Sequence, residues 1–390
     1  MKVNFFGGKL CLLLVLLVAE SAALGAWVRR EVKIPDVLGY KTLKCDFHMH
    51  TVFSDGAVWP YVRTDEAWRE GLDAFAITDH IRYHKHEEDL PTDNNRSYEI
   101  AKPGAEALGL TIIKGGEISR KMPPGHFNAI FLKDVSQLDT EEWRDVIKAA
   151  VEQEAFIFWN HPGWKKQAPE GKPVWYAEHT ELYEKGWMHG IEIVNGDEYY
   201  PLAHKWALEK KLTMIGNSDV HYPMNMMYEF GEGEHREMTL VLAKDKSKEA
   251  IKEALKGRRT VVYQKNRLIG EEKYLRAIFD ESIEIVNPEV TIKGKEEVKI
   301  QIRNKSEIDF ELAAEGALKE ISAPEEITLY GDGTVQLKIK GKVEELSGKK
   351  KIRLPYKVKN LLIRPEEGLR TELVINVNFV LVEKGEISKK

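Results

Sequence analysis

The chain has 390 residues, of which 58 are basic and 63 acidic, so its formal net charge is −5. Apolar residues make up 43% and charged residues 31%, which excludes a mostly disordered, collagen-like or multi-span membrane protein. The length predicts two folded domains. The slightly acidic charge argues against binding along duplex nucleic acid, which needs a basic face.

Residues 1–26 are predicted to be a secretory signal peptide. Lys2 and Lys9 flank the start of an apolar run over residues 10–19, and small residues follow it. The run is shorter than the ~20 residues that a membrane span needs, with an uncleaved N-terminal anchor as the alternative. We therefore expect a periplasmic or secreted protein without a membrane span. After cleavage Cys45 is the only cysteine, so no intrachain disulfide is expected.

Residues 27–267 are predicted to form an α/β domain. Short apolar runs alternate there with amphipathic stretches such as EEWRDVIKAAVEQE, whose apolar residues recur at helical spacing. Seven segments are predicted to be strands: TLKCDFHMH, AFAITDH, LTIIKGGE, FNAIFL, AFIFWNHP, GIEIVN and LTMIGNSDVH. Repeated βα units of this kind predict a parallel sheet or barrel.

The pattern changes after a predicted connector at residues 268–281. Segments such as EVTIKGKEEVKIQIRN and TELVINVNFVLV alternate polar and apolar residues with a period of two, and turn residues separate them. Residues 282–390 are therefore predicted to be a small antiparallel β-sandwich domain. We expect it to pack beside the first domain or to shape substrate access; attachment to a surface or glycan is the alternative.

Histidines and acids recur at the ends of the predicted strands. In CDFHMH, strand alternation places Asp46, His48 and His50 on one face, where two imidazoles can hold a cation and Asp46 is expected to orient one of them. Sites in parallel βα folds form at the C-terminal ends of strands. Each of these motifs alone is more often a packed histidine or a turn. Together they favour a metal site, because buried imidazoles and carboxylates without a partner cost free energy, and a bound metal supplies that partner. The later strand ends contribute Asp55, Asp79, His80, Glu117, His126, His161, Asp219 and His221.

The ordered set HMHTVFSDG, TDH, GGE, a lone histidine, NHP and SDVH resembles the polymerase and histidinol phosphatase (PHP) superfamily of metal-dependent phosphoesterases. The resemblance covers roughly residues 42–263. It implies a distorted (β/α)7 barrel with a trinuclear metal site at its mouth.

The resemblance also implies a ligand set, carried over by motif position. One ion would be held by His48, His50, Glu117 and Asp219, a second by Glu117, His126 and His161, and a third by Asp55, His80 and His221. Nitrogen and oxygen ligands without a thiolate suit Mn²⁺, Zn²⁺ or Fe²⁺. A metal-bound hydroxide held by Glu117, Asp219 and His161 would attack phosphorus without a side-chain nucleophile.

Other polar residues near the motifs receive less direct assignments. Asp79 points away from the face of His80 in a regular strand, so we expect it outside the ligand set. Arg82, Arg120 and Asn195 flank the motifs and are candidates to bind phosphate, with solvated loop positions as the alternative. His84 and His86 are expected on the surface.

The sequence thus predicts an exported metal-dependent phosphoesterase that hydrolyses phosphodiesters or phosphomonoesters of small organic or nucleotide substrates. Two alternatives stay open: a non-catalytic metal or ligand sensor, and a metal-dependent hydrolase of a non-phosphate bond. The sequence gives neither the identity of the ester nor the oligomeric state.

Overall fold

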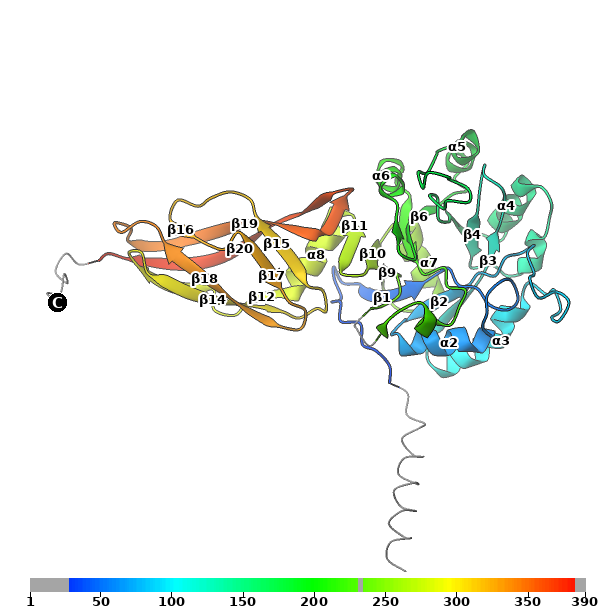
Figure 1. Ribbon diagram of the computed structural model, residues 1–390, viewed down its shortest axis with the longest axis horizontal. Helices are drawn as coiled ribbons and strands as arrows, with labels where there is room; N and C mark the ends of the chain where they lie inside the picture. Colours follow the sequence, from blue (N-terminus) through cyan, green and yellow to red (C-terminus); the bar gives the residue numbers. More distant parts are fainter. Residues whose placement is uncertain (1–27, 231–233, 383–390) are drawn as a thin grey trace, which may run out of the picture.

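The structure, a computed structural model, describes residues 28–230 and 234–382, so the predicted signal peptide lies outside the described residues. It has two lobes (Figure 1), an α/β barrel coloured blue to green and an all-β lobe coloured yellow to red. Within the described ranges, no helix is long and apolar enough to cross a membrane.

The barrel sheet follows the order β9-β1-β2-β3-β4-β5-β6-β8. Neighbouring strands are parallel from β1 to β3 and from β5 to β8, whereas β4 and β9 run antiparallel to their neighbours. Two reversed strands among parallel ones make this a distorted α/β barrel. The strands are β1 (Lys41–Asp46), β2 (Ala74–Ile77), β3 (Thr111–Ile118), β4 (Phe127–Ile130), β5 (Phe156–Trp159), β6 (Gly190–Asn195), β8 (Thr213–Asn217) and β9 (Met238–Ala243).

Strands β8 and β9 meet through a side chain. The backbone N–H of Gly216 donates to Oγ1 of Thr239 at 3.0 Å, and this hydroxyl donates to the carbonyl of Gly216 at 2.8 Å. A Cβ atom on Gly216 would collide with a methyl group of Val262 in β10 (Thr260–Gln264). Glycine is therefore required where the barrel wall closes.

Helices cover the outside of the barrel because each buries one apolar stripe. In α4, which the sequence predicts, Val146, Ile147 and Ala150 are buried. In α7, Ser247 caps the first turn by accepting a hydrogen bond from the N–H of Ala250. The helices are α2 (Pro60–Arg69), α3 (Arg96–Ala107), α4 (Trp143–Glu152), α5 (Ala177–Glu184), α6 (Pro201–Lys210) and α7 (Lys248–Lys256).

The C-terminal lobe has two packed sheets. One contains β12 (Ile283–Ile285), β14 (Glu297–Asn304), β18 (Thr334–Gly341) and β16 (Ile321–Ser322). The other contains β13 (Glu289–Lys293), β20 (Glu367–Val380), β19 (Gly348–Arg364), β15 (Phe310–Ala314) and β17 (Glu326–Leu329). Alternate residues of β14, such as Ile300 and Ile302, are buried between them. The predicted fold class, an α/β barrel followed by an antiparallel β-sandwich, is confirmed.

A continuous sheet joins the two lobes. Strand β10 pairs with β11 (Arg267–Gly270), and β11 pairs in parallel with β19 at Leu268–Leu361 and Ile269–Leu362. Helix α8 (Glu272–Ser282) then carries the chain to β12 (Figure 1). The segment predicted as a connector is therefore built from a strand and a helix. The remaining elements are β7 (Glu198–Tyr199) and two short 3-10 helices, Val135–Leu138 and Met224–Met226.

Candidate metal centre

The first two histidines follow β1 at the barrel mouth. The chain stays extended beyond Asp46, so His48 and His50 point the same way, and both are fully buried. The N–H of His50 donates to the carbonyl of Val220 at 3.0 Å, which fixes this segment beside the loop after β8. The ring centroids of His48 and His50 are 5.1 Å apart. Alternate positions of the extended segment after β1 thus supply two neighbouring ligands.

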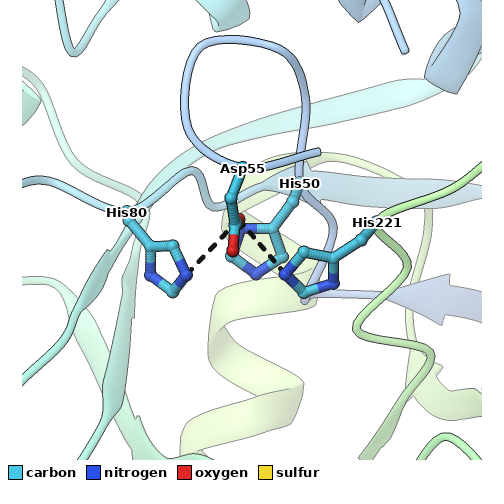
Figure 2. Close-up of side chains that lie close together, drawn as sticks. All are labelled: His50, Asp55, His80 and His221. Atoms are coloured by element: carbon cyan, nitrogen blue, oxygen red, sulfur yellow. Dashed lines mark ion pairs between the residues drawn. The ribbon is translucent and has the colours of Figure 1, made fainter. Parts of the chain in front are cut away.

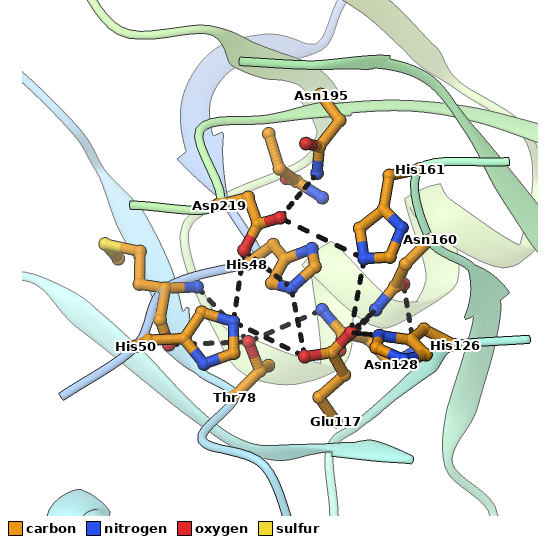
Figure 3. Close-up of polar contacts among 12 residues, drawn as sticks. His48, His50, Thr78, Glu117, His126, Asn128, Asn160, His161, Asn195 and Asp219 are labelled. Atoms are coloured by element: carbon orange, nitrogen blue, oxygen red, sulfur yellow. Dashed lines mark hydrogen bonds and ion pairs between the residues drawn. The ribbon is translucent and has the colours of Figure 1, made fainter. Parts of the chain in front are cut away.

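Glu117, at the end of β3, lies at the centre of the cluster (Figure 3). Its Oε2 lies 3.4 Å from Nε2 of His50 and 2.7 Å from Nδ1 of His80. Its Oε1 lies 2.8 Å from Nδ1 of His126 and 3.4 Å from Nε2 of His161. This buried carboxylate therefore faces imidazoles on both of its oxygens.

Asp219, just past β8, faces the same imidazoles from the other side (Figure 3). Its Oδ1 lies 3.2 Å from Nε2 of His48 and 3.1 Å from Nε2 of His50, and its Oδ2 lies 4.0 Å from Nε2 of His161. The backbone φ of Asp219 is +53°, and that of His161 is +27°. Non-glycine residues adopt such conformations at a cost that surrounding contacts must offset.

Asp55 gathers a second group nearer the surface (Figure 2). Its Oδ1 lies 3.2 Å from Nε2 of His221, 3.5 Å from Nε2 of His80 and 3.7 Å from Nδ1 of His50. The side chains of Asp55 and His221 are 22% and 29% exposed, whereas His50 and Glu117 are fully buried. The cluster is therefore open to solvent on the side of Asp55 and His221.

The close packing of acids and imidazoles shifts their pKa values. Burial opposes protonation of His80, yet the Glu117 and Asp55 carboxylates raise its pKa to about 10. Burial and the neighbouring His221 imidazole lower the pKa of His50 to about 4. Burial would raise the pKa of Glu117, but the surrounding imidazoles, His80 first, hold it well below its usual range. A histidine binds a metal ion only as the neutral imidazole. Ion binding would therefore release protons from any imidazole that is protonated in the metal-free protein.

The donor set fits divalent metal ions. In the described part of the chain, six cluster atoms are buried without a hydrogen-bond partner: Nε2 of His48, Nε2 of His50, Oδ1 of Asp55, Oε2 of Glu117, Nδ1 of His161 and Oδ1 of Asp219. Two atoms that each lie about 2.1 Å from one ion are roughly 3.0–3.4 Å apart. The 3.1, 3.2 and 3.4 Å separations around His48 and His50 match this range.

The structure brings all nine sequence-predicted ligands together. They fall into four groups whose ligand atoms lie within 4.8 Å of one another: His50, Asp55, His80 and His221; His48, His50 and Glu117; His48, His161 and Asp219; and Glu117, His126 and His161. Three of these groups resemble the ligand sets that the family resemblance implies. His50 also joins the Asp55 group, which the sequence does not indicate.

The expectation that Asp46 orients an imidazole is wrong. Its carboxylate accepts hydrogen bonds from Oγ of Ser218 at 2.5 Å, from the backbone N–H of His48 at 3.2 Å and from Nη1 of Arg236 at 3.0 Å. Nδ1 of His48 instead lies 2.9 Å from Oε1 of Glu192. Strand alternation does not reveal which side chains meet across the barrel, and it is there that His48 pairs with Glu192.

The other flanking residues have distinct partners. Asp79 accepts hydrogen bonds from Thr51 and Ser54 and so holds the turn that carries Asp55, outside the ligand groups. Nδ2 of Asn195 lies 3.3 Å from Oδ2 of Asp219, beside the cluster.

Arg82 and Arg120 both donate to the carbonyl of Thr140, at 3.2 and 2.7 Å, and Arg82 also pairs with Asp139. Their guanidinium groups thus contact the loop after the first 3-10 helix, and phosphate binding by these two residues stays a prediction.

Sequence reasoning missed Glu192 and the role of His84. Glu192 is fully buried in β6, and its only sequence signal is a lone carboxylate inside the apolar run GIEIVN. His84 is half-buried, not a simple surface residue. Its two ring nitrogens lie 2.9 Å from the carbonyl of Phe53 and 3.0 Å from that of Ile81. It therefore joins the turn before Asp55 to the loop after His80.

Comparison with known proteins places this architecture. The chain is 44% identical to a two-domain protein from Bacteroides vulgatus that contains a predicted PHP-like metal-dependent phosphoesterase. The match has a TM-score of 0.85 and covers 90% of this chain and 100% of the other. The model of an Ig-like domain family matches residues 283–374. No match was found among curated proteins.

Two further structures match less than half of this chain at low identity. A candidate metal-dependent phosphoesterase from Bifidobacterium adolescentis is 17% identical, with a TM-score of 0.37 over 47% of this chain and 89% of the other. An amidohydrolase from Chromobacterium violaceum is 15% identical, with a TM-score of 0.35 over 46% and 88%. At these scores the likeness carries no functional weight.

A buried cage of imidazoles and carboxylates at the mouth of an α/β barrel defines a metal-dependent hydrolase. The extent of the match to the Bacteroides vulgatus protein shows which kind of metal-dependent hydrolase this is. This chain belongs to the family of two-domain PHP-like metal-dependent phosphoesterases, with an Ig-like C-terminal region.

Proposed function

We propose that this protein hydrolyses phosphomonoesters or phosphodiesters of small organic or nucleotide substrates at a trinuclear metal site. The observation that carries the proposal is a set of four buried, unpartnered atoms that face one another in the cluster: Nε2 of His48, Nε2 of His50, Oε2 of Glu117 and Oδ1 of Asp219. Packing alone does not account for such atoms, because each would cost free energy without a partner. Family membership supports the phosphoesterase reaction.

The nine ligand residues divide their tasks by position. Glu117 belongs to two ligand groups and is placed to join neighbouring ions. His48, His50 and Glu117 form a buried floor, whereas Asp55 and His221 lie at the opening, where a substrate would arrive. Divalent ions such as Mn²⁺, Zn²⁺ or Fe²⁺ would supply the positive charge that a phosphate ester needs and would activate water for hydrolysis.

Aromatic side chains adjoin the cluster on two sides. The ring of Trp164 lies 5.2 Å from that of His161 and 5.5 Å from that of His126. The ring of Tyr83, half exposed, lies 5.7 Å from that of His80. These rings offer faces on which an organic or base moiety of the ester could stack.

We also propose that the protein works outside the cytoplasm, in the periplasm or as a secreted enzyme. The support is the basic and apolar N-terminal pattern of the sequence. An exported phosphoesterase would scavenge phosphate from organic esters. N-terminal sequencing of protein from the periplasm or medium should begin near residues 24–27, and cytoplasmic, full-length protein would contradict this proposal.

Metal analysis and hydrolysis assays test the site directly. The mature protein, with both domains present and loaded with Mn²⁺ or Zn²⁺, should hold more than one ion per chain. It should also cleave p-nitrophenyl phosphate or bis-p-nitrophenyl phosphate. Chelation should abolish cleavage, and added metal should restore it. Bound metal without cleavage of any phosphate ester would support the sensor, and cleavage of an amide or lactone alone would support the non-phosphate hydrolase.

Substitutions separate the cluster from the rest of the barrel. His50→Ala and Asp219→Ala should each lower kcat/KM at least about 100-fold and reduce the metal content, because each removes an atom that faces two others. His86→Ala removes a histidine outside the ligand groups and serves as the matched control. Normal turnover in either cluster variant, with the fold verified by circular dichroism, would show that the ligand assignment is wrong.

A further inference from the structure

Glu192 connects separate parts of the metal centre. It is fully buried in β6 and accepts four hydrogen bonds. Oε1 accepts from Nδ1 of His48 at 2.9 Å and from Nδ2 of Asn217 at 2.8 Å. Oε2 accepts from the backbone N–H of His161 at 2.7 Å and from Nδ2 of Asn195 at 2.9 Å. One carboxylate therefore contacts residues that follow β1 and β5 and the last residues of β6 and β8.

The contact with His48 selects the tautomer of its imidazole. Oδ1 of Asn217 accepts from the backbone N–H of Phe47 at 2.8 Å, which turns Nδ2 of Asn217 toward Glu192. Oε1 of Glu192 is thus an acceptor, and the proton of neutral His48 sits on Nδ1. Nε2 of His48 then presents its lone pair to the unpartnered oxygens of Glu117 and Asp219, at 3.6 and 3.2 Å.

The contact with His161 holds a strained backbone. The φ of His161 is +27°, which is costly for a residue with a Cβ atom. The 2.7 Å hydrogen bond from its N–H to Glu192 offsets part of this cost. Asn195 extends the same network, because its Nδ2 also lies 3.3 Å from Oδ2 of Asp219. Glu192 thereby orients ligands from three segments at once.

We infer that Glu192 is a positioning residue that makes the cluster competent to bind metal, although it is not itself a ligand. This inference rests on the proposed function, since it assumes that the cluster holds ions. It assigns to β6 a task that the ligand motifs do not include. The physical basis is that a histidine binds a metal through one nitrogen only when the other carries the proton.

The substitution Glu192→Gln tests this role with little change in shape. The amide replaces one acceptor oxygen with an NH₂ group, which must face one of the two pairs of donors. If it faces His48, Nδ1 must become an acceptor, and the proton moves to Nε2, where it blocks coordination. If it faces His161, the strained N–H loses its acceptor. Either outcome weakens the metal site.

Binding of Co²⁺ alone to the full-length, metal-free chain provides a readout independent of activity. We expect Glu192→Gln to bind Co²⁺ 10–100-fold more weakly than the wild type and to change the visible absorption of the bound ion. The matched control is Glu237→Gln, which makes the same change at a buried carboxylate outside the ligand groups and should bind as the wild type does. Unchanged affinity and absorption in Glu192→Gln would overturn the inference.

Two further observations keep the test decisive. If the wild-type chain binds no Co²⁺, the proposed metal centre itself fails, which differs from a failure confined to Glu192. If Glu192→Gln does not fold, Asn195→Ala removes the hydrogen bond to Oε2 of Glu192, together with the longer one to Oδ2 of Asp219, without burying an unpaired donor. We expect that variant to bind Co²⁺ more weakly, by a smaller factor, and wild-type binding by a folded Asn195→Ala would overturn the inference.

Discussion

Glu237 illustrates how one buried group sets a pH dependence of stability. Its carboxylate is 1% exposed, and the hydroxyl of Tyr228 donates to Oε2 at 2.5 Å, while Oε1 has no partner among the described residues. Burial raises the pKa of Glu237 to about 7. The folded state therefore binds a proton that the unfolded state, with an ordinary pKa, releases between about pH 4.5 and 7. Stability from this group is present at low pH and is lost as the pH rises through 7.

We predict that Glu237→Gln stabilises the protein at pH 8. The neutral amide removes the cost of ionising a buried carboxylate, roughly 1.4 kcal/mol per pKa unit, so the rise of the Glu237 pKa from about 4.5 to about 7 predicts a gain of roughly 3.5 kcal/mol. At pH 5 both side chains are neutral, and the gain should be small. Urea unfolding at the two pH values measures the difference. Glu229→Gln, at an exposed carboxylate, is the control, and an equal gain in both variants would show that burial is not the cause.

The residue scale is also where the sequence was least informative. Strand alternation predicted that His48 and His50 share one face, and the resemblance to the PHP superfamily implied that Glu117 and Asp219 join them, because alternation and motif order are local properties of the chain. Neither indicated that Asp46 turns to Arg236 and Ser218, since these partners are 190 and 172 residues away. Side-chain pairing across the barrel depends on the register of strands that only the folded structure brings together.

At the scale of elements, the close contact between β8 and β10 leads to a prediction about Gly216. A methyl group at position 216 would collide with Val262, a stiff β-branched side chain. Gly216→Ala should therefore destabilise the protein by about 1–3 kcal/mol. Val262→Ala, which leaves space, should restore part of this loss when the two are combined. Equilibrium unfolding of the single and double variants measures the coupling, and additive effects would contradict the proposed clash.

The order of elements was predicted better than their directions. Short apolar runs mark strands and 3.6-residue periodicity marks helices, so β1 to β6, β8 and α4 follow from local sequence. The antiparallel direction of β4 and β9 does not follow, because periodicity carries no information about strand direction. The pairing of β11 with β19 escaped prediction for the same reason, and the segment at 268–281 was expected only to connect.

One of the hydrophobic clusters in the described part of the chain crosses from the barrel to the sandwich. This cluster of buried side chains includes Leu240 in the barrel sheet, Leu268 in β11, Phe279 in α8, and Phe310 and Leu361 in the sandwich. Together with the continuous sheet, this core couples the two lobes. Cooperative unfolding as a single unit is expected, because separating the lobes would expose buried apolar surface.

We predict coincident unfolding transitions for the two lobes. All nine tryptophans lie before residue 207, so tryptophan fluorescence reports only on the N-terminal part of the chain. Hydrogen exchange of peptides from residues 283–382 reports on the sandwich. In guanidinium chloride both probes should share one midpoint. Leu361→Lys, which places a charge in the shared core, should separate the midpoints, whereas Val380→Lys, at an exposed position, should not. Separate midpoints in the wild type would contradict the coupling.

The sequence by itself determined the two-part architecture, the strand ends that carry chemistry and the set of residues that the cluster assembles. Periodicity, motif order and residue chemistry act over a few residues and are legible without a fold. Only the tertiary structure decided that Glu192 accepts a hydrogen bond from His48, that Arg82 and Arg120 donate to the carbonyl of Thr140, and that one sheet joins both lobes. These contacts join residues far apart in sequence, and their geometry exists only once strand register and direction are set.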